Sequence, residues 1–468
     1  MNKQETTRKN SKYEIDMTTG SILPKMLRFT LPLMLSSMLQ LLFNAADIIV
    51  VGKSGENGDF YMGAVGSNGA LINLLIGLFI GLSVGSNVIA ARCFGAKEDE
   101  ELSKTVHTSM MVALVSGALL TVAGLIFSKQ MLILMDTPEE LLEYSSRYLS
   151  IYFLGMIPTT VYNFGSALLR AIGDTKRPLY YLTAAGFLNV ILNIITVLVF
   201  DLNVSGVAIA TVVSQTMSAA LVVRCLMKES GGIKLVPSKL RFDRAKLAQI
   251  IRIGLPAGLQ GTLFSLSNVV IQSSINKFGP VVVSGNSAAA NLEGFVYVGM
   301  NSFYQAVISF VSQNFGVRKY KRIVRSLLTG VACAVVVGLV LGISLTICGN
   351  PLLHIYANSQ EVVNAGEVRF LYVAAPYFLC GIMDTLVGGL RGIGYSFAPM
   401  VVSLMGACVF RIIWIKTIFA IMPDASIIWV YISYPLSWAL TATVHAVCFF
   451  FLLRRVKRKY PPEPGIDE

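Results

Sequence analysis

The sequence predicts an all-α polytopic membrane protein with twelve transmembrane helices, arranged as two parallel repeats of six. Three observations predict this fold: an apolar composition, a one-sided distribution of basic residues, and an internal duplication. Of the 468 residues, 54% are hydrophobic and only 14% are charged. A soluble domain carries about 25% charged residues, so this chain lacks the polar surface that several soluble domains would need.

The predicted helices are the apolar runs of the chain. A helix needs about 20 mostly apolar residues to cross roughly 30 Å of hydrocarbon. Helices are favoured over open strands because every backbone polar group must be satisfied inside the lipid. The qualifying runs lie near 28–51, 67–91, 106–127, 148–169, 179–200, 205–227, 250–275, 282–311, 326–347, 369–390, 399–421 and 427–453.

The basic residues predict the orientation of these helices. If both termini are cytoplasmic, 31 of the 38 Lys and Arg residues lie on the cytoplasmic side. Two lie within the eleventh predicted span, Arg411 and Lys416. The remaining five lie outside: Lys53, Lys129, Arg147, Lys277 and Arg369. This bias follows the positive-inside rule. The net charge of +12 therefore indicates orientation in a cell (plasma or inner) membrane and attraction to anionic headgroups, not nucleic-acid binding.

The second half of the chain repeats the first. The loop LRAIGDTKRP at 169–178 corresponds to LRGIGYSFAP at 390–399, and Pro32 corresponds to Pro256. Asn44 aligns with Asn268, and Asn163 aligns with Asp384. Because each unit has six spans, both halves enter the membrane in the same sense, and their pseudo-twofold axis runs along the membrane normal. Such repeats are typical of secondary transporters with a central site.

The repeat and the polar stretches predict five parts of the chain. These are a cytoplasmic tail at 1–21, an N-lobe at 22–227, a cytoplasmic loop at 228–249, a C-lobe at 250–453 and a basic cytoplasmic tail at 454–468. The first 21 residues lead into a long apolar helix without a small-residue cleavage site, so we expect no removable signal peptide.

Polar residues inside the predicted spans are candidates for function, because an intramembrane charge costs at least about 2.5–3.5 kcal/mol. In the first span Gln40, Asn44 and Asp47 share one helical face. Asn189 and Asn193 repeat the four-residue spacing, and Thr211 lies in the next span. One carboxylate among neutral oxygens can bind a proton or Na⁺. The alternative is that Asp47 only ends a helix in headgroup water.

The second half carries Glu293, Asp384 and Arg411 inside predicted spans. They take part either in coupling or in a structural ion pair of Arg411 with Asp384 or Glu293, which would neutralise buried charges. Together with Gln40, Asn44, Asn163 and Asn268 they form the predicted polar lining of a substrate cavity.

Pro32 and Pro256 lie early in their spans, where each removes one helix hydrogen bond and permits a kink. Gly77, Gly81 and Gly85 recur every four residues, a spacing that favours close helix contact over a hinge. The three histidines are isolated and fit no metal-ligand spacing, so we expect neither a metal site nor a cofactor.

Several of these features together resemble the multidrug and toxic compound extrusion (MATE) family. They are the twelve spans in two halves, the pattern Pro32…Gln40…Asp47, the loop LRAIGDTKRP and the run GVAIATVVSQ at 206–215. The resemblance covers 22–455 and is closer to the DinF-like branch.

The resemblance implies a monomeric antiporter in the bilayer that exports small amphipathic, often cationic organic compounds in exchange for H⁺ or Na⁺. It implies that Asp47 is the coupling carboxylate, that Asn189 and Thr211 belong to its cluster, and that the first helix bends at Pro32. Two positions depart from the family: Asn193 replaces a second coupling Asp, and Phe264 replaces a glutamate of another branch.

A flippase for a lipid-linked oligosaccharide is the alternative transport function. Two extra spans or a strongly cationic cavity would favour it, and the sequence has twelve spans. An enzyme would need a metal cluster or paired acids at matching depth, and the sequence has neither pattern. A channel would more often close a symmetric ring of subunits.

Overall fold

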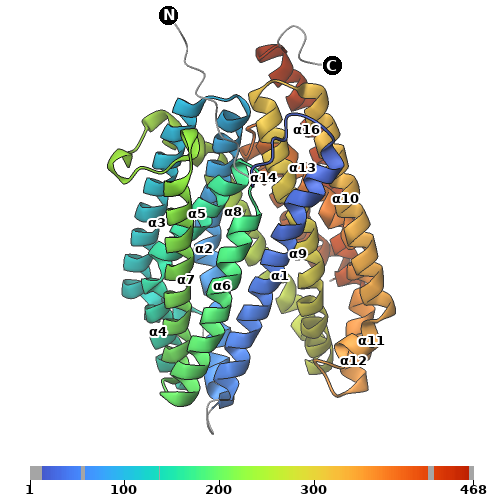
Figure 1. Ribbon diagram of the computed structural model, residues 1–468. Helices are drawn as coiled ribbons and strands as arrows, with labels where there is room; N and C mark the ends of the chain where they lie inside the picture. The colour runs from blue at the N-terminus through green and yellow to red at the C-terminus, as the bar shows by residue number, and fades with distance from the viewer. Residues whose placement is uncertain (1–12, 54–57, 136, 420–425, 463–468) are drawn as a thin grey trace, which may run out of the picture. The chain divides into compact units, whose positions relative to one another are not determined.

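The computed structural model describes residues 13–53, 58–135, 137–419 and 426–462. Within these ranges the chain is helical with short connections, and no residue forms a strand (Figure 1). The α-helices are α1 (Ile22–Gly52), α2 (Gly58–Gly95), α3 (Asp99–Leu134), α4 (Glu139–Leu154), α5 (Met156–Ala171), α6 (Lys176–Asn193), α7 (Asn203–Lys228), α8 (Arg244–Ile275), α9 (Pro280–Gly316), α10 (Tyr320–Ile347), α11 (Gly349–Leu353), α12 (Gln360–Arg369), α13 (Phe378–Gly392), α14 (Phe397–Ser403), α15 (Phe410–Trp414) and α16 (Ile428–Lys459).

Short π and 3₁₀ segments join or extend several helices. The π segments are η1 (Ile194–Val199), η5 (Phe370–Ala374), η7 (Leu404–Val409) and η8 (Ile415–Phe419). The 3₁₀ segments are η2 (Gly231–Ile233), η3 (Pro237–Lys239), η4 (Asn276–Phe278) and η6 (Ala375–Tyr377). The tenth predicted span therefore runs without a break in helical structure from α12 through η5 and η6 into α13.

The described ranges confirm an all-helical membrane fold. In them, nine helices or continuous helix runs are long and apolar enough to span a membrane. The other three predicted spans coincide with the α4–α5 pair, which is interrupted at Gly155, and with α8 and α9, which carry more polar side chains. The count of twelve stays a prediction.

The contacts divide the chain into two compact units. Unit 1 comprises Met1–Asp16 and Leu35–Gly258, and unit 2 comprises Met17–Met34 and Leu259–Glu468. The divisions fall inside α1 and α8, two residues after Pro32 and two residues after Pro256. The lobe boundaries expected from the sequence stay predictions, but the two helices that change unit are the two that contain repeat-related prolines.

Close helix packing in unit 1 depends on two of the three glycines in α2. A Cβ on Gly81 would lie 2.1 Å from the Gly258 nitrogen, and a Cβ on Gly85 would lie 2.4 Å from the Ile250 oxygen. Both contacts are with α8, whose first half belongs to unit 1. A Cβ on Gly77 would meet no heavy atom of the described residues within 4 Å. The predicted static packing role is confirmed for Gly81 and Gly85 and is wrong for Gly77.

The internal repeat also appears in the backbone. Gly173 and Gly394, which occupy the same place in the two repeated loops, have φ angles of 90° and 94°. Lys97 and Arg318, which follow the Phe-Gly pairs of the two halves, have φ angles of 58° and 54°. Left-handed backbone is rare for residues other than glycine. Its recurrence at matching positions shows that the halves share local structure as well as sequence.

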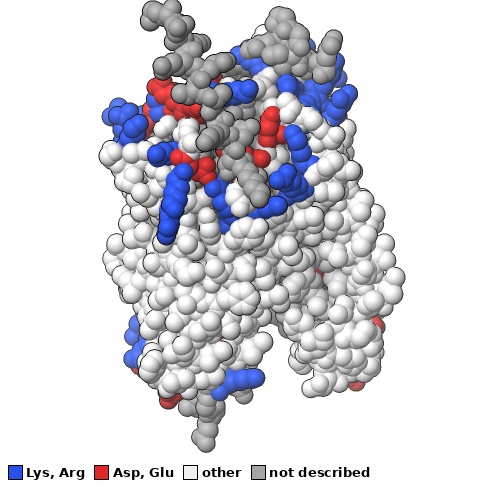
Figure 2. Space-filling model, viewed as in Figure 1, with Lys and Arg blue, Asp and Glu red and all other residues white. Residues whose placement is uncertain are grey.

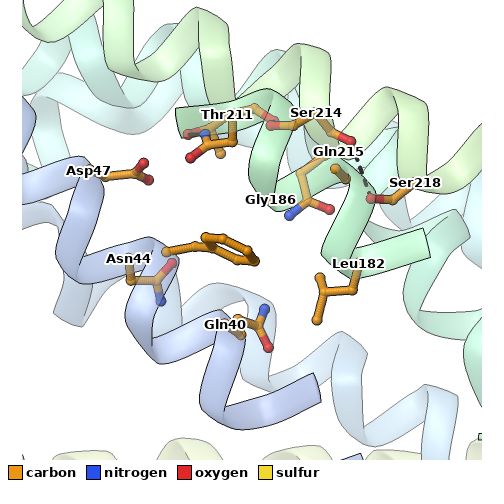
Figure 3. Close-up of a pocket in the computed structure, with 12 residues that line it drawn as sticks. Gln40, Asn44, Asp47, Leu182, Gly186, Thr211, Ser214, Gln215 and Ser218 are labelled. Atoms are coloured by element: carbon orange, nitrogen blue, oxygen red, sulfur yellow. Dashed lines mark hydrogen bonds between the residues drawn. The ribbon is translucent and has the colours of Figure 1, made fainter. Parts of the chain in front are cut away.

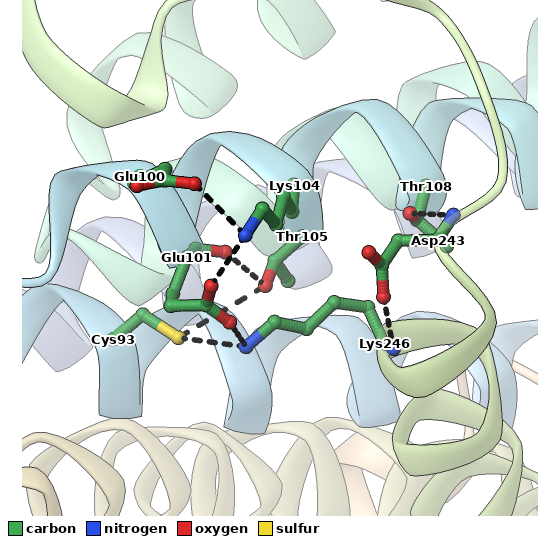
Figure 4. A network of polar contacts seen from close by, with 8 residues as sticks. All are labelled: Cys93, Glu100, Glu101, Lys104, Thr105, Thr108, Asp243 and Lys246. Carbon is green, nitrogen blue, oxygen red and sulfur yellow. Dashed lines mark hydrogen bonds and ion pairs between the residues drawn. The ribbon is translucent and has the colours of Figure 1, made fainter.

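The end of the segment 229–243 and the start of α8 are held against α3 by polar contacts (Figure 4). The ammonium group of buried Lys246 lies 2.8 Å from a carboxylate oxygen of Glu101. The backbone N–H of Asp243 donates to the hydroxyl of Thr108 at 3.0 Å. The Asp243 side chain in turn accepts a bond from the backbone N–H of Lys246 at 2.9 Å, which caps the start of α8. These contacts join the end of the segment and the start of α8 to α3 within unit 1.

Charged residues are unevenly distributed along the helices of each unit. In Figure 2 the middle of the visible surface of both units is almost free of charge. Lys and Arg gather where α7 leads into α8 in unit 1 and where α16 finishes in unit 2. An uncharged band with more basic residues at one end than at the other is typical of helices that cross a bilayer.

Candidate functional site

A polar pocket lies among α1, α6 and α7 in unit 1 (Figure 3). It encloses about 400 Å³, including the part open to solvent. Gln40, Asn44 and Asp47 face into it from α1, as their spacing predicts, and Thr211 and Gln215 face them from α7. The remaining lining residues are Phe43, Leu182, Ala185, Gly186, Asn189, Ser214 and Ser218.

A chain of hydrogen bonds connects the polar residues of this pocket. Asn193 donates from Nδ2 to Oδ1 of Asp47 at 2.5 Å and to Oδ1 of Asn189 at 3.2 Å. Asn189 Nδ2 lies 3.4 Å from the hydroxyl oxygen of Thr211. The structure thus brings together the four residues predicted to bind the coupling ion, from three helices.

The cluster has the composition of a site for a proton or a small hard cation. Asp47 supplies a carboxylate, and Asn189 and Thr211 supply neutral oxygens. Asn193 is fully buried, and its Oδ1 has no hydrogen-bond partner among the described residues. Hard cations prefer oxygen ligands, and an unsatisfied buried oxygen is costly without a partner. The residues present therefore fit Na⁺ as well as H⁺.

The helix changes form next to this cluster. Asn193 is the last residue of α6, and the π segment η1 begins directly after it. A π turn shifts the phase of the side chains that follow, and such turns are frequent at functional sites. Asn189 and Asn193 lie before this segment and are hydrogen-bonded to each other, as their four-residue spacing predicts, whereas Thr196 lies within η1 and donates to the carbonyl of Leu192.

Not every predicted polar residue reaches the pocket. Asn163 donates to the carbonyl of Thr159 one turn earlier in α5 and does not line the pocket. Conversely, Ser218 lines the pocket although the sequence did not single it out; it lies four residues after Ser214, which places both on the same face of α7.

Unit 2 contains a pocket of its own, of about 570 Å³, which brings together Asn268, Asp384 and Arg411. Asn44 and Asn268 therefore line one pocket each, as their repeat relationship predicts. The carboxylates do not correspond: Asp47 lies on α1 in unit 1, whereas Asp384 lies on α13 in unit 2. Phe264 also lines the second pocket; by the resemblance, it stands where another branch of the family has a glutamate.

The structural alternative of an ion pair between Arg411 and Glu293 is wrong, because Glu293 pairs with Arg369. Arg369 donates from Nε and Nη2 to the two carboxylate oxygens of Glu293, at 2.9 and 2.7 Å, and from Nη1 to Asn286 Oδ1 at 2.7 Å. The sequence places Arg369 in an external loop, but it is only 7% exposed at the end of α12. The chain stays helical after Arg369, because η5 begins at Phe370, so Arg369 lies within a continuous helix run and not in a loop. Glu293 does not line the pocket.

The fold and the pockets define a class of protein: a helical membrane protein with a duplicated architecture and a polar pocket in each half. The MatE family model matches residues 32–195 and again residues 256–415, so its two matches start at the two repeat-related prolines. The chain belongs to this family. It is therefore a multi-pass membrane transporter and not an enzyme.

Relatives and solved structures agree with this assignment. The chain is 27% identical over 433 residues to the probable multidrug resistance protein YoeA of Bacillus subtilis, covering 90% of this chain and 92% of the relative. It is 22% identical over 407 residues to the multidrug export protein MepA of Staphylococcus aureus, covering 86% and 89%.

A MOP superfamily transporter from Pyrococcus furiosus shares the fold with a TM-score of 0.89 at 20% identity, over 96% of this chain and 99% of that one. An outward-facing multidrug resistance MATE family transporter superposes with a TM-score of 0.88, also at 20% identity, over 96% of this chain and 100% of that one.

Proposed function

We propose that this protein is a monomeric secondary antiporter of the cell membrane. It exports amphipathic, often cationic organic compounds in exchange for H⁺ or Na⁺. The relatives named as multidrug resistance and export proteins support the substrate class. The observation that carries the antiport mechanism is the hydrogen-bonded cluster of Asp47, Asn193, Asn189 and Thr211 beside a polar pocket.

The cluster links ion binding to the conformation of α1. An ionised Asp47 accepts hydrogen bonds only, so it is held by the amide of Asn193. A proton or Na⁺ neutralises the carboxylate and changes which bonds it makes. Asp47 and Pro32 lie on the same helix, and Pro32 leaves one backbone hydrogen bond of α1 unmade. Ion binding is thereby coupled to a bend of α1.

Ion and substrate then act on each other through the same helix. Gln40 and Asn44 line the pocket from the face of α1 that carries Asp47. A substrate that binds these side chains favours one conformation of α1 and the ion favours another, which is the reciprocal coupling that exchange requires.

The test is substrate efflux from vesicles that contain the purified full-length protein. Ethidium transport is compared under a pH gradient, a Na⁺ gradient, both gradients and neither. Antiport is supported if one gradient drives uphill movement of ethidium and if ethidium added in excess moves the ion in return. Transport that only equilibrates ethidium, whatever the gradients, would contradict the proposal.

A further inference from the structure

The pocket in unit 2 contains both a buried cation and a carboxylate, together with aromatic side chains. Its volume of about 570 Å³, part of it open to solvent, is in the usual range for pockets that hold small molecules. The aromatic lining residues are Phe264, Tyr297, Tyr377, Tyr434 and Trp438.

Arg411 lacks a full set of acceptors in this pocket. Its side chain is on the pocket wall and the residue is only 6% exposed. Nε donates to the hydroxyl of Ser437 at 2.8 Å, but Nη2 is buried without a hydrogen-bond partner in the part of the chain that the structure describes. Nor does a carboxylate of that part form an ion pair with it. A buried guanidinium needs an acceptor, and a carboxylate meets this need best because it can accept two parallel bonds.

The aromatic side chains hold Arg411 in position. Its guanidinium carbon lies 4.2 Å from the ring centre of Tyr434 and 5.5 Å from that of Trp438. Each of these cation–π contacts occupies one face of its ring, so that face is not available to a cationic ligand. A ligand that carries only positive charge would also be repelled by Arg411 at short range.

Asp384 supplies the opposite charge in the same pocket. The residue is half-buried on α13, and among the described residues no group donates a hydrogen bond to its carboxylate or forms an ion pair with it. An ionised carboxylate accepts hydrogen bonds only, so it favours a ligand nitrogen that carries a proton or a positive charge.

We propose that the pocket of unit 2 binds amphoteric organic molecules, with the ligand's carboxylate on Arg411 and its cationic nitrogen near Asp384. This inference rests on the proposed function and narrows it, because it assigns a class of substrate that carries both charges. The aromatic rings contact the apolar body of such a ligand.

A pair of dyes that differ in one group tests the proposal. Rhodamine 110 has a free carboxylate, and rhodamine 123 is its methyl ester, a cation with the same ring system. Binding of both dyes to the full-length protein in lipid nanodiscs is measured by fluorescence polarisation without any gradient. The variants are Arg411→Gln, Arg411→Lys, Asp384→Asn and, as a control on the same predicted span, exposed Lys416→Gln.

We expect the wild-type protein and Lys416→Gln to bind rhodamine 110 more tightly than rhodamine 123. Loss of a charge-assisted bond weakens binding by about tenfold or more, so Arg411→Gln should lose the preference for the free acid through weaker binding of rhodamine 110 alone. Arg411→Lys should retain part of the preference, and Asp384→Asn should weaken binding of both dyes. If the preference is absent from the wild type, or unchanged in Arg411→Gln, the proposal is overturned.

Two safeguards keep the result interpretable. If Arg411→Gln does not fold, the ratio of the two affinities in Arg411→Lys decides, since an unchanged ratio there also overturns the proposal. The proposed antiport is tested separately, with ethidium under gradients. If dye selectivity depends on Arg411 but no gradient drives transport, only the proposed antiport is refuted. If a gradient drives transport but dye selectivity does not depend on Arg411, only the proposed amphoteric site is refuted.

Discussion

Asn193 donates a hydrogen bond to Asp47 across 2.5 Å, and this contact joins the end of α6 to the second half of α1 within unit 1. By the resemblance to the family, Asn193 stands where several members have a second carboxylate. An amide at this place can hold an ionised Asp47 by donation, whereas a second carboxylate would repel it. The cluster of Asp47, Asn189, Asn193 and Thr211 therefore contains one acidic group.

The first prediction concerns this amide. Asn193→Ala removes a donor to Asp47 that is worth about 1.5–3 kcal/mol when the acceptor is charged. If H⁺ is the coupling ion, the midpoint of transport should move to higher pH by about one unit or more, because the neutral form of Asp47 is favoured. If Na⁺ is the coupling ion, half-maximal transport should need about tenfold more Na⁺, because a ligand oxygen is lost.

Asn163→Ala is the matched control for this measurement, since Asn163 bonds only within its own helix in the described contacts and lies off the pocket. Ion dependence should be unchanged in the control. Equal shifts in the two variants would mean that Asn193 acts through general stability.

The second prediction concerns the buried ion pair in unit 2. Arg369→Met leaves Glu293, which is 3% exposed, as an uncompensated buried charge and should destabilise the protein by about 3–5 kcal/mol. Combining it with Glu293→Met should restore most of the lost stability, as followed by thermal unfolding in detergent. Exposed Lys416→Met should have no effect. A double variant as unstable as Arg369→Met would show that the contact with Asn286 matters more than the charge pair.

The third prediction uses the α2–α8 contact. Gly85→Val places a side chain where the backbone of α8 already lies, and overpacking of this kind costs at least about 1–3 kcal/mol. The melting temperature should therefore fall. Gly77 lies about two turns earlier on the same helix. Gly77→Val should leave the melting temperature unchanged, because no heavy atom of the described residues lies within 4 Å of a Cβ at this position. Similar melting temperatures for the two variants would contradict the packing role.

The sequence predicted those features that depend on local spacing. Gln40, Asn44 and Asp47 face one pocket because residues three and four apart share a helical face, and the prolines and the repeated loops were recognisable by alignment of the two halves. The grouping of Asp47 with Asn189 and Thr211, which lie on other helices, was suggested by their polarity inside predicted spans and by the resemblance to a known family.

Features that depend on tertiary contacts were missed. Glu293 and Arg369 are 76 residues apart, and nothing in their local patterns indicates that both are buried. Arg369 was assigned to a loop because a charge at the edge of an apolar run normally ends a span. The π segments next to Asn193 and Arg411 were also not predictable, because a π turn has no sequence period of its own.

The fourth prediction tests the orientation. The asymmetry of Lys and Arg places the segment 229–243 in the cytoplasm and the connection between α11 and α12 outside. In a background in which the seven native cysteines are replaced, Ser359→Cys should react with an impermeant maleimide in intact cells, and Ser238→Cys should react only after permeabilisation. Both side chains are exposed, so accessibility within the protein does not limit either reaction. The reverse labelling pattern would refute the orientation.

The last prediction is that Asp47 carries the coupling ion. Asp47→Asn keeps the size of the side chain and removes its ability to ionise, so α1 should stay in the conformation of the neutral residue. The variant should insert, melt near the wild-type temperature and bind ethidium, since Gln40, Asn44 and the α7 side chains still line the pocket. It should not move ethidium uphill under a pH or Na⁺ gradient.

Without the coupling ion, Asp47→Asn loses a substantial driving force. One charge that crosses 100 mV supplies about 2.3 kcal/mol, which can sustain a concentration gradient of roughly fiftyfold for a neutral substrate exchanged one for one. The matched control is Asp201→Asn, which removes an exposed carboxylate near the end of the same pair of helices α6 and α7, outside the pocket. This control should pump normally. If Asp47→Asn, at equal expression, also pumps at the wild-type rate, then the carboxylate only ends a helix, and the ion must bind elsewhere.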